Sequence, residues 1–470
     1  MFKNLLLSAI LMLVSIPSLV SAQENNLHGM SSEYDWPKDP KVLSKLNEWQ
    51  NLKFGMIIHW GLYAQAGIVE SWELTSEDWI NRKDSMSYCE YKEWYWGLSK
   101  EFNPVNFAPD QWAQAAKAAG MKYVVFTTKH HDGFNMFDTK ETDFKITNGP
   151  FANHPKANVA KYVFEAFRNQ DMMIGAYYSK PDWHSQYFWW DKYGSWDRNV
   201  NYNLGEHPDR WNKYKAFTYN QINELTSDYG NIDILWLDGG WVREGRKVRN
   251  GEQSIDIPKI AARARENQPG LLVVDRTVHG PYENYQTPER SIPDRQINNP
   301  WESCIPLANN WGYVPNDKLK SSTKIIHSLV EIVAKGGSLL LGIGPKPDGT
   351  LRDGDLKRMG EIGIWLDSNG KAIYNTRITP EYNDGNVFFT KGQAGETFAI
   401  AIITEGEDTP ATISWKGNLP KKGSSVKLLS SGKKVKWTEK NGEVTVTIPK
   451  SFISKNAKYP ALAFEYNAKN

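Results

Sequence analysis

The chain has 470 residues, and its charge is almost balanced: 56 Lys and Arg against 54 Asp and Glu give a net charge of +2. This balance gives no reason to expect nucleic acid or an anionic membrane as a partner. Hydrophobic residues make up 40% of the chain, enough for a large core, while a mean hydropathy of −0.58 excludes an integral membrane protein. The length predicts two domains.

The first 22 residues have the pattern of a signal peptide. Lys3 supplies a positive charge, residues 5–20 are almost continuously apolar, and Val20-Ser21-Ala22 is a small-residue cleavage site. The apolar run is too short, and wrongly flanked, for a membrane span. We therefore expect an exported protein, periplasmic or secreted, without membrane insertion. Cys89 and Cys304, the only cysteines, lie far apart in the sequence and are predicted to be free, buried thiols.

Short apolar strands alternate with amphipathic helical segments between about residues 50 and 345. This alternation predicts parallel βαβ units. No Gly-x-Gly-x-x-Gly follows the first strand, which argues against a dinucleotide-binding sheet. We therefore predict a (β/α)8-like (TIM-type) barrel as the catalytic domain, residues 30–376. The predicted strands are 54–59, 123–128, 174–178, 234–237, 271–274 and 338–343, and the predicted helices are 109–119, 158–169, 211–229, 259–267 and 316–335.

The pattern changes after Tyr374, where helical periodicity stops and short alternating strands begin. Asn441-Gly442 between two of them is a strong hairpin signal. We predict a C-terminal antiparallel β-sandwich over residues 380–470. Such a domain either covers the flank of the barrel or binds sugar, and we favour the first. The predicted strands are 387–390, 398–403, 411–415, 425–429, 435–438, 444–448 and 462–466.

Polar and aromatic side chains follow five of the predicted barrel strands. The carboxyl ends of barrel strands carry the functional side chains, and capping roles do not easily explain five such ends together. The chain also holds 20 Trp and 22 Tyr, whose flat faces and polar edges suit sugars. The strand ends are His59-Trp60-Gly61, Lys129-His130-His131-Asp132-Gly133, Tyr177-Tyr178-Ser179, Asp238-Gly239-Gly240-Trp241 and Asp275-Arg276.

Asp238 is the most informative single residue. It follows a buried strand and precedes Gly239 and Gly240, which we expect to leave room for a substrate. A carboxylate that accepts backbone N–H groups in a turn is an equally good interpretation of this pattern alone. Hydrolysis of a glycosidic bond needs a second carboxyl group, and the candidates downstream are Glu283, Glu289, Asp294 and Glu302.

Together these motifs resemble glycoside hydrolase family 29, the α-L-fucosidases. The resemblance implies a barrel followed by a β-sandwich, fucosylated oligosaccharides or glycoconjugates as substrates, and no cofactor or metal. It also implies a retaining mechanism in which Asp238 is the nucleophile. The matching stretches are Lys53 to Met56, His59-Trp60-Gly61, Tyr123 to Phe134 with Thr-Lys-His-His-Asp-Gly-Phe, Leu235-Trp236-Leu237-Asp238-Gly239, Pro300-Trp301-Glu302 and Leu339 to Gly349.

The resemblance also assigns a binding pocket. It implies that His59, His130 and His131 hydrogen-bond fucose hydroxyls and that an aromatic wall meets the fucose methyl group. Further implied pocket members are Tyr177, Trp236, Arg276 and Trp301. The sequence departs from the family at two places: Ser71 separates Glu70 from Trp72, where the family has an adjacent Glu-Trp pair, and Gly342 replaces the usual Asn before Ile-Gly-Pro.

Two residues compete for the role of acid/base. In the family branch that acts on branched α-1,3/1,4-linked fucose, this residue lies in a Thr-Pro-Glu loop, which Thr287-Pro288-Glu289 matches. In parts of the broader branch it lies nearer a Trp-Glu strand, which Glu302 matches; desolvation beside Trp301 would raise its pKa. We favour Glu289, and hence an exo-acting, retaining α-L-fucosidase of the branched-linkage type.

Two rival functions are weighed against this one. A metal-dependent barrel hydrolase would use His59, His130, His131 and Asp238, but neighbouring histidines on a regular strand point in opposite directions. A non-catalytic sugar-binding protein would lack the nucleophile, whereas Asp238 is present.

Overall fold

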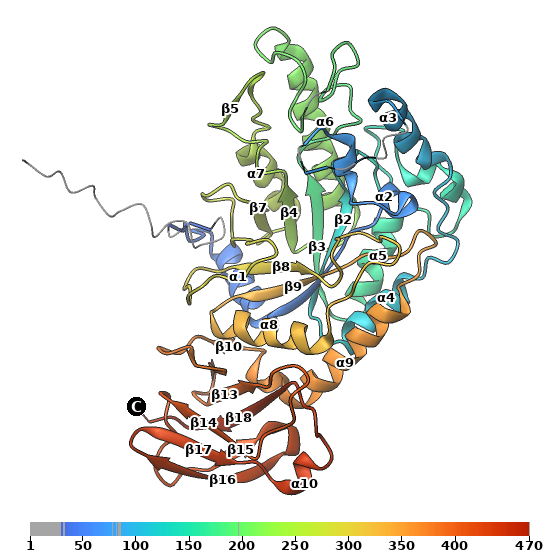
Figure 1. Cartoon of the computed structure of the whole chain (residues 1–470). Coiled ribbons are helices and arrows are strands. Elements are labelled where there is room, and N and C mark those ends of the chain that lie inside the picture. The colour runs from blue at the N-terminus through green and yellow to red at the C-terminus, as the bar shows by residue number, and fades with distance from the viewer. Residues whose placement is uncertain are drawn as a thin grey trace, which may run out of the picture.

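The computed structural model describes residues 30–31, 33–77, 79–80, 82, 86–195 and 197–469. The predicted signal peptide, residues 1–22, lies outside the described residues. The chain forms a curled parallel sheet surrounded by helices, with an antiparallel β unit packed beside it (Figure 1). Within the described residues, no helix is both long and apolar enough to cross a bilayer.

Seven parallel strands form the curled sheet, in the order β7-β4-β3-β2-β1-β9-β8. All six predicted strands are present, and the short strand suspected beside Trp301 is β8. The first strand pairs with both β2 and β9, so the last parallel strand of the chain lies beside the first, while β7 and β8 form the two edges of the curled sheet in the described part of the chain. The strands are β1 (Phe54–Ile58), β2 (Tyr123–Lys129), β3 (Met173–Ser179), β4 (Ile234–Asp238), β7 (Leu272–Asp275), β8 (Glu302–Pro306) and β9 (Ser338–Ile343).

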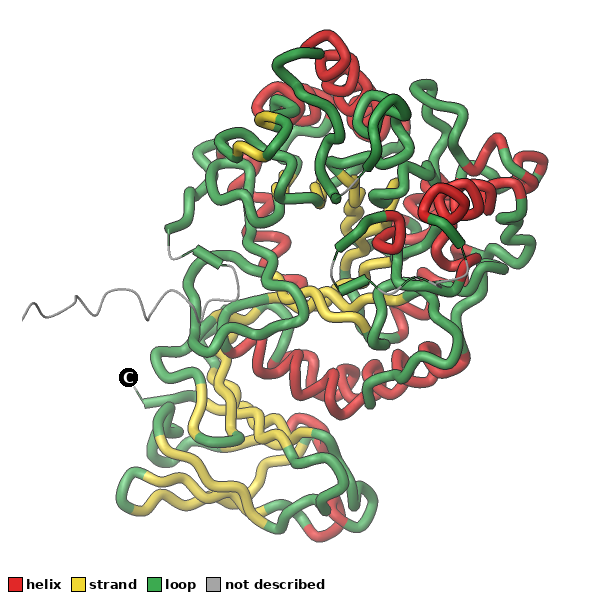
Figure 2. Tube along the Cα trace, turned by 45° about the horizontal axis from the view of Figure 1, so that its top comes forward, coloured by secondary structure: helices red, strands yellow, loops and turns green. Residues whose placement is uncertain are grey.

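Helices cover the outer face of the sheet, and loops gather at the carboxyl ends of the strands (Figure 2). The five predicted helices are present, but the one expected from residue 316 begins only at Ser322, because the Ser321 side chain caps it by accepting from Lys324 N. The helices around the sheet are α4 (Pro109–Ala118), α5 (Val159–Arg168), α6 (Pro208–Asp228), α7 (Ile257–Asn267), α8 (Ser322–Ala334) and α9 (Asp353–Asn369).

Helix α9 was not predicted from the sequence, and two further unpredicted helices have clear places in the fold. Helix α1 (Pro40–Leu52) packs Trp49 into the cluster that fills the sheet interior, where its ring stacks on Tyr285 with centroids 3.9 Å apart. Helix α3 (Tyr88–Gly97) lies at the surface and carries Cys89, which is exposed. Cys304 in β8 is buried, and both thiols are free. The prediction of two buried thiols is therefore wrong for Cys89.

The C-terminal unit is antiparallel, in the order β10-β12-β13-β18-β15-β16-β17-β14. Asn441 and Gly442, at φ 54° and 76°, form the two-residue turn that this pair predicts. The unit packs on α8 and α9, where Trp365 Nε1 donates to Ala461 O at 2.9 Å. All seven predicted strands are present: β12 (Val387–Gly392), β13 (Thr397–Ile402), β14 (Thr412–Lys416), β15 (Val426–Leu428), β16 (Lys433–Lys440), β17 (Glu443–Thr447) and β18 (Ala461–Tyr466), with β10 (Thr376–Arg377) in addition.

Candidate active site

A cavity of about 490 Å³ opens at the carboxyl ends of the parallel strands. Its size falls in the ~300–1,000 Å³ range of small-molecule sites. The predicted strand ends meet here, together with residues from the connecting loops. The lining residues are Ile57, His59, Glu70, Trp72, His130, Arg198, Trp236, Asp238, Gly240, Trp241, Arg243, Arg246, Arg276, Thr277, Glu289, Cys304 and Trp311.

Asp238 is the last residue of β4, and both its carboxylate oxygens are hydrogen-bonded. Oδ1 accepts from Arg276 Nη1 and from Gly239 N, each at 2.8 Å, while Oδ2 accepts from the Tyr177 hydroxyl at 2.6 Å. Burial alone would raise the pKa of Asp238, but the charge of Arg276 and the Tyr177 hydrogen bond outweigh it and hold that pKa well below its usual range. Asp238 is therefore a fixed, ionised carboxylate.

The two glycines after Asp238 serve the packing of loops. A Cβ at Gly239, whose φ is +91°, would meet the Pro181 ring, and a Cβ at Gly240 would meet the Thr277 hydroxyl. The expectation that Gly239 leaves room for a substrate is therefore wrong, because Pro181 fills that space. Gly240 does line the cavity, but its missing side chain also makes way for a neighbouring loop.

Arg276 connects two carboxylates. Its Nη1 contacts Asp238, and its Nη2 donates to Glu289 Oε2 at 2.8 Å. The indole N–H of Trp311 donates to the other oxygen, Glu289 Oε1, at 3.1 Å. The Glu289 side chain is 42% exposed, against 16% for Asp238. Glu289 therefore stands at the open side of the cavity and Asp238 at its floor.

Glu302 lies inside the barrel and has no exposed surface. Its oxygens accept from the Tyr123 hydroxyl at 2.6 Å and from Trp236 Nε1 at 3.2 Å. Burial raises the pKa of Glu302 to about 7, as predicted in direction, although both hydrogen bonds oppose the shift. Glu302 does not line the cavity; it supports Trp236, which does.

The other expected carboxylates and Trp301 also lie away from the cavity. Glu283 is buried and accepts from Thr277 N at 3.0 Å, and neither it nor Asp294 is among the lining residues. Trp301 is fully buried, and its ring covers Gly337. The structure therefore does not bring Trp301 to the pocket where the family resemblance had put it.

The two adjacent histidines point the same way. Strand β2 ends at Lys129, and its pairing with β3 shifts between Thr127 and Lys129, so His130 and His131 lie beyond the regular strand. Their ring centroids are 4.3 Å apart. One ring nitrogen from each histidine and a carboxylate oxygen of Asp238 all lie within 4.8 Å of one another. The expectation that they point in opposite directions is therefore wrong.

Burial keeps the pocket histidines neutral. It lowers the pKa of His130 to about 4 and holds the pKa values of His59 and His131 well below the usual 6.5. They can thus either donate or accept a hydrogen bond, as the hydroxyl groups of a sugar require. His59 stacks on Trp311, with ring centroids 5.2 Å apart.

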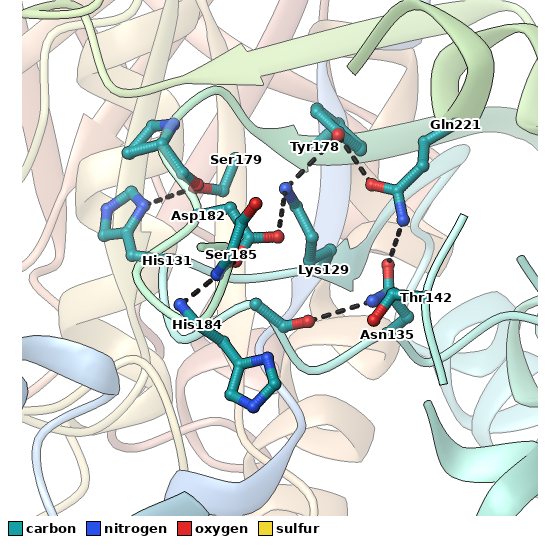
Figure 3. Close-up of polar contacts among 12 residues, drawn as sticks. Lys129, His131, Asn135, Thr142, Tyr178, Ser179, Asp182, His184, Ser185 and Gln221 are labelled. Atoms are coloured by element: carbon teal, nitrogen blue, oxygen red, sulfur yellow. Dashed lines mark hydrogen bonds and ion pairs between the residues drawn. The ribbon is translucent and has the colours of Figure 1, made fainter. Parts of the chain in front are cut away.

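The surroundings of His131 determine which of its nitrogens carries the proton (Figure 3). The Ser179 hydroxyl donates its one hydrogen to Pro181 O at 2.6 Å. The Ser179 oxygen is also 2.6 Å from His131 Nδ1, so Nδ1 must be the donor of that contact. In neutral His131 the lone pair is then on Nε2, which faces Asp238 Oδ2 at 3.6 Å. Nε2 is therefore an acceptor for a hydroxyl group.

A buried ion pair supports this part of the site (Figure 3). Lys129 Nζ lies 3.2 Å from Asp182 Oδ2 and also donates to the Tyr178 hydroxyl. The second oxygen of Asp182 accepts from the backbone N–H groups of His184 and Ser185. The pair thus fastens the loop after β3 to the end of β2, next to His131.

The serine between Glu70 and Trp72 does not remove either residue from the site. Glu70 and Trp72 both line the cavity, and Ser71 turns inward so that its Oγ lies 2.5 Å from His130 Nδ1. Glu70 Oε1 accepts from Trp311 N and Gly312 N at 2.7 and 2.9 Å. Glu70 therefore holds the loop that carries Trp311.

Several lining residues were missed by the sequence analysis. Trp311 follows β8 along the chain, so the rule applied to the other strand ends would have found it had Glu302–Pro306 been counted as a barrel strand. Arg198 comes from the loop after β3, and Arg243 and Arg246 from the loop after β4. No local pattern marks these loop residues.

A barrel whose cavity holds an ionised aspartate, a second carboxyl group and aromatic walls has the arrangement of a glycoside hydrolase. The comparison with known proteins gives the family. The family model described as alpha-L-fucosidase matches residues 21–371. The chain therefore belongs to the alpha-L-fucosidase family and hydrolyses α-L-fucosidic bonds.

Relatives with known names agree over most of the chain. Plasma alpha-L-fucosidase of Homo sapiens is 26% identical over 426 residues, which cover 85% of each chain. Tissue alpha-L-fucosidase of Mus musculus is 27% identical and covers 73% of this chain and 75% of its own. Among solved structures, alpha-L-fucosidase isoenzyme 1 from Paenibacillus thiaminolyticus has a TM-score of 0.74 at 28% identity, covering 92% of this chain and 100% of its own. Thermotoga maritima alpha-fucosidase with a mechanism-based inhibitor has a TM-score of 0.72 at 26% identity, with the same coverage.

Proposed function

We propose that the enzyme is an exo-acting, retaining α-L-fucosidase in which Asp238 is the nucleophile and Glu289 the acid/base. The observation that carries this proposal is the guanidinium of Arg276, which contacts both carboxylates at 2.8 Å. Asp238 is ionised and lies at the floor of the cavity, as the role of nucleophile requires. Glu289 stands at the open side, where the leaving sugar departs.

The shared guanidinium suits a two-step reaction. In the free enzyme the charge of Arg276 is divided between the carboxylates of Asp238 and Glu289. Glu289 takes up a proton from solvent before the first step and transfers it to the leaving oxygen while Asp238 attacks the anomeric carbon and the glycosidic bond breaks. The ester then formed by Asp238 carries no charge, so Arg276 stabilises the Glu289 carboxylate. In the second step that carboxylate takes a proton from water while the water oxygen displaces Asp238 from the anomeric carbon.

Substitution of each carboxylate tests the assignment. Asp238→Ala should abolish turnover of an aryl fucoside, and normal kcat in that variant would contradict it. Glu289→Ala should regain activity with azide, which needs no base for its attack, whereas Glu302→Ala should not, because Glu302 does not reach the cavity. Azide rescue of Glu302→Ala alone would reverse the two roles and favour a broad-specificity enzyme.

We propose terminal fucose in α-1,3/1,4 linkage on branched glycans as the substrate. The support is the loop Thr287-Pro288-Glu289, which places an acid next to an open rim. The test compares kcat/KM for a Lewis-type trisaccharide and for a simple aryl fucoside. A higher value for the aryl fucoside would contradict the proposed linkage preference.

Export is proposed from residues 1–22, which have the pattern of a signal peptide. It is tested by cell fractionation and by N-terminal sequencing of the mature enzyme.

A metal-dependent hydrolase is the alternative that one observation favours, because His130, His131 and Asp238 could share an ion. Arg276 argues against it, since its charge already lies 2.8 Å from the Asp238 carboxylate and would repel a dication. Activity that survives prolonged chelation would exclude this alternative, and its loss with recovery on adding a metal would establish it.

A further inference from the structure

The rim of the catalytic cavity carries three arginines that the proposed hydrolysis of fucosides does not use. Arg198, Arg243 and Arg246, here called the arginine rim, line the cavity together with Arg276. Arg276 is balanced by the two carboxylates that it contacts. A fucosyl group is neutral and needs no further cation, so the arginine rim requires a separate explanation.

Arg198 is the fixed member of the arginine rim. Its guanidinium makes a two-point ion pair with Glu77, with Nε–Oε1 and Nη2–Oε2 distances of 2.8 and 2.9 Å. It also lies over the rings of Trp72 and Trp241, 4.9 and 5.0 Å from their centroids. Arg198 is therefore neutralised and built into the aromatic wall of the cavity.

Arg243 and Arg246 are not neutralised in this way. Arg243 donates to Thr277 O at 3.0 Å, and across the described residues neither arginine forms an ion pair with a carboxylate. Arg246 is exposed at the cavity mouth. Partial burial, together with the charges of Arg243 and Arg198, lowers the pKa of Arg246, so Arg246 lies near two other arginines.

Both arginines lie on the connection between β4 and α7, which begins directly after Asp238. This connection continues into the hairpin of β5 (Lys247–Val248) and β6 (Gly251–Glu252), which projects above the carboxyl ends of the strands (Figure 1). Arg246 is exposed, whereas the Asp238 side chain is only 16% exposed, so Arg246 lies nearer the mouth of the cavity than Asp238 does.

We propose that Arg243 and Arg246 bind an anionic group, a sulfate ester or a carboxylate, on the saccharide that carries the fucose. The inference rests on the proposed function, because it assumes that the fucosyl group occupies the floor beside Asp238. Guanidinium groups match the oxygen pairs of such anions with two parallel hydrogen bonds. Because Arg243 and Arg246 have no carboxylate partner among the described residues, their guanidinium groups can form these paired hydrogen bonds without first breaking an ion pair.

The test uses four substrates: a neutral fucosylated trisaccharide, the same trisaccharide with a sulfate ester, its sialylated form, and an aryl fucoside. At low salt we expect kcat/KM to be about tenfold higher for at least one anionic trisaccharide than for the neutral one, as charge-assisted hydrogen bonds allow. High salt should remove this preference by screening. Which anionic form is preferred distinguishes a sulfate site from a carboxylate site.

The variants Arg243→Gln and Arg246→Gln should reduce the ratio of anionic to neutral kcat/KM to near one. Arg249→Gln is the matched control, because Arg249 lies in the same hairpin and is exposed but does not line the cavity; the ratio should not change. Equal kcat/KM of the wild type for neutral and anionic trisaccharides would overturn the inference. Failure of the wild type to hydrolyse any of the four substrates, the aryl fucoside included, would instead contradict the proposed function.

Discussion

The imidazole of His131 is held in one tautomer by the hydroxyl of Ser179, whose oxygen lies 2.6 Å from Nδ1. Ser179→Ala removes this acceptor, so the proton can move from Nδ1 to Nε2 and His131 loses the lone pair that faces the cavity. We expect kcat/KM to fall about tenfold, the value of a hydrogen bond of ~1–1.5 kcal/mol. Nitrogen-15 shifts of labelled histidine should show Nδ1–H in the wild type and a changed tautomer in the variant.

Ser179→Thr keeps the hydroxyl and should retain the wild-type tautomer. A wild-type His131 with the proton on Nε2, or the same tautomer in Ser179→Ala, would contradict this role of Ser179. A purely structural effect of Ser179→Ala would lower stability without moving the nitrogen shifts.

Glu302 should make the stability of the protein depend on pH. Its pKa is about 7 in the folded chain, against 4.5 when unfolded, so the folded state binds the extra proton between these values. The stabilisation is complete below pH 4.5 and is lost as the pH rises to 7, about 3 kcal/mol in all. Glu302→Gln cannot ionise and should lack this loss. Urea unfolding of both proteins at pH 5 and pH 8 measures the difference, and equal pH dependence would contradict it.

The buried pair Lys129–Asp182 should matter far more for stability than a surface pair of similar length. Asp182→Asn leaves the fully buried Lys129 ammonium without its counterion, which should cost about 3–5 kcal/mol in the free energy of unfolding. The control is Asp110→Asn, which breaks the exposed pair with Lys156 at 3.1 Å and should cost at most ~1 kcal/mol. Equal costs of the two substitutions in denaturant unfolding would contradict this view of the pair.

The elements with strong patterns could be predicted from sequence. Each barrel strand is a short apolar run because both its faces are buried, and five of the strands end in polar residues such as His59 and Asp238 that meet at one edge of the sheet. The positions of Asp238 and Glu289 beside one cavity therefore followed from the strand ends and the family motifs. Helix α1 was missed because its role, closing the sheet interior with Trp49, depends on residues distant in the sequence.

Side-chain direction at the ends of strands could not be predicted. Strand alternation predicts that His130 and His131 lie on opposite sides, but β2 ends at Lys129 after a shift in its pairing with β3, so both histidines lie beyond the regular strand and face Asp238. Sequence also gave no sign that the Tyr123 hydroxyl, at the start of β2, would satisfy Glu302. Such contacts between strands arise only when the sheet curls.

Gly342 should control the acid/base through Trp311. A Cβ at Gly342 would lie 2.6 Å from Cε3 of the Trp311 ring and 3.0 Å from Pro306 Cα, so Gly342→Ala must displace the indole. The displaced ring loses its hydrogen bond to Glu289 and its stacking on His59. Gly342 therefore provides the space that Trp311 occupies.

We expect Gly342→Ala to lower kcat/KM about tenfold for a natural trisaccharide, the worth of one hydrogen bond to a charged group. An activated aryl fucoside should be affected less, because its leaving group needs little protonation. Trp311→Phe, which keeps a ring but lacks the N–H, should show the same difference between substrates. Gly360→Ala is the control, since a Cβ there meets nothing within 4 Å. Equal losses on both substrates in Trp311→Phe would show that Trp311 contacts the sugar alone and does not act through Glu289.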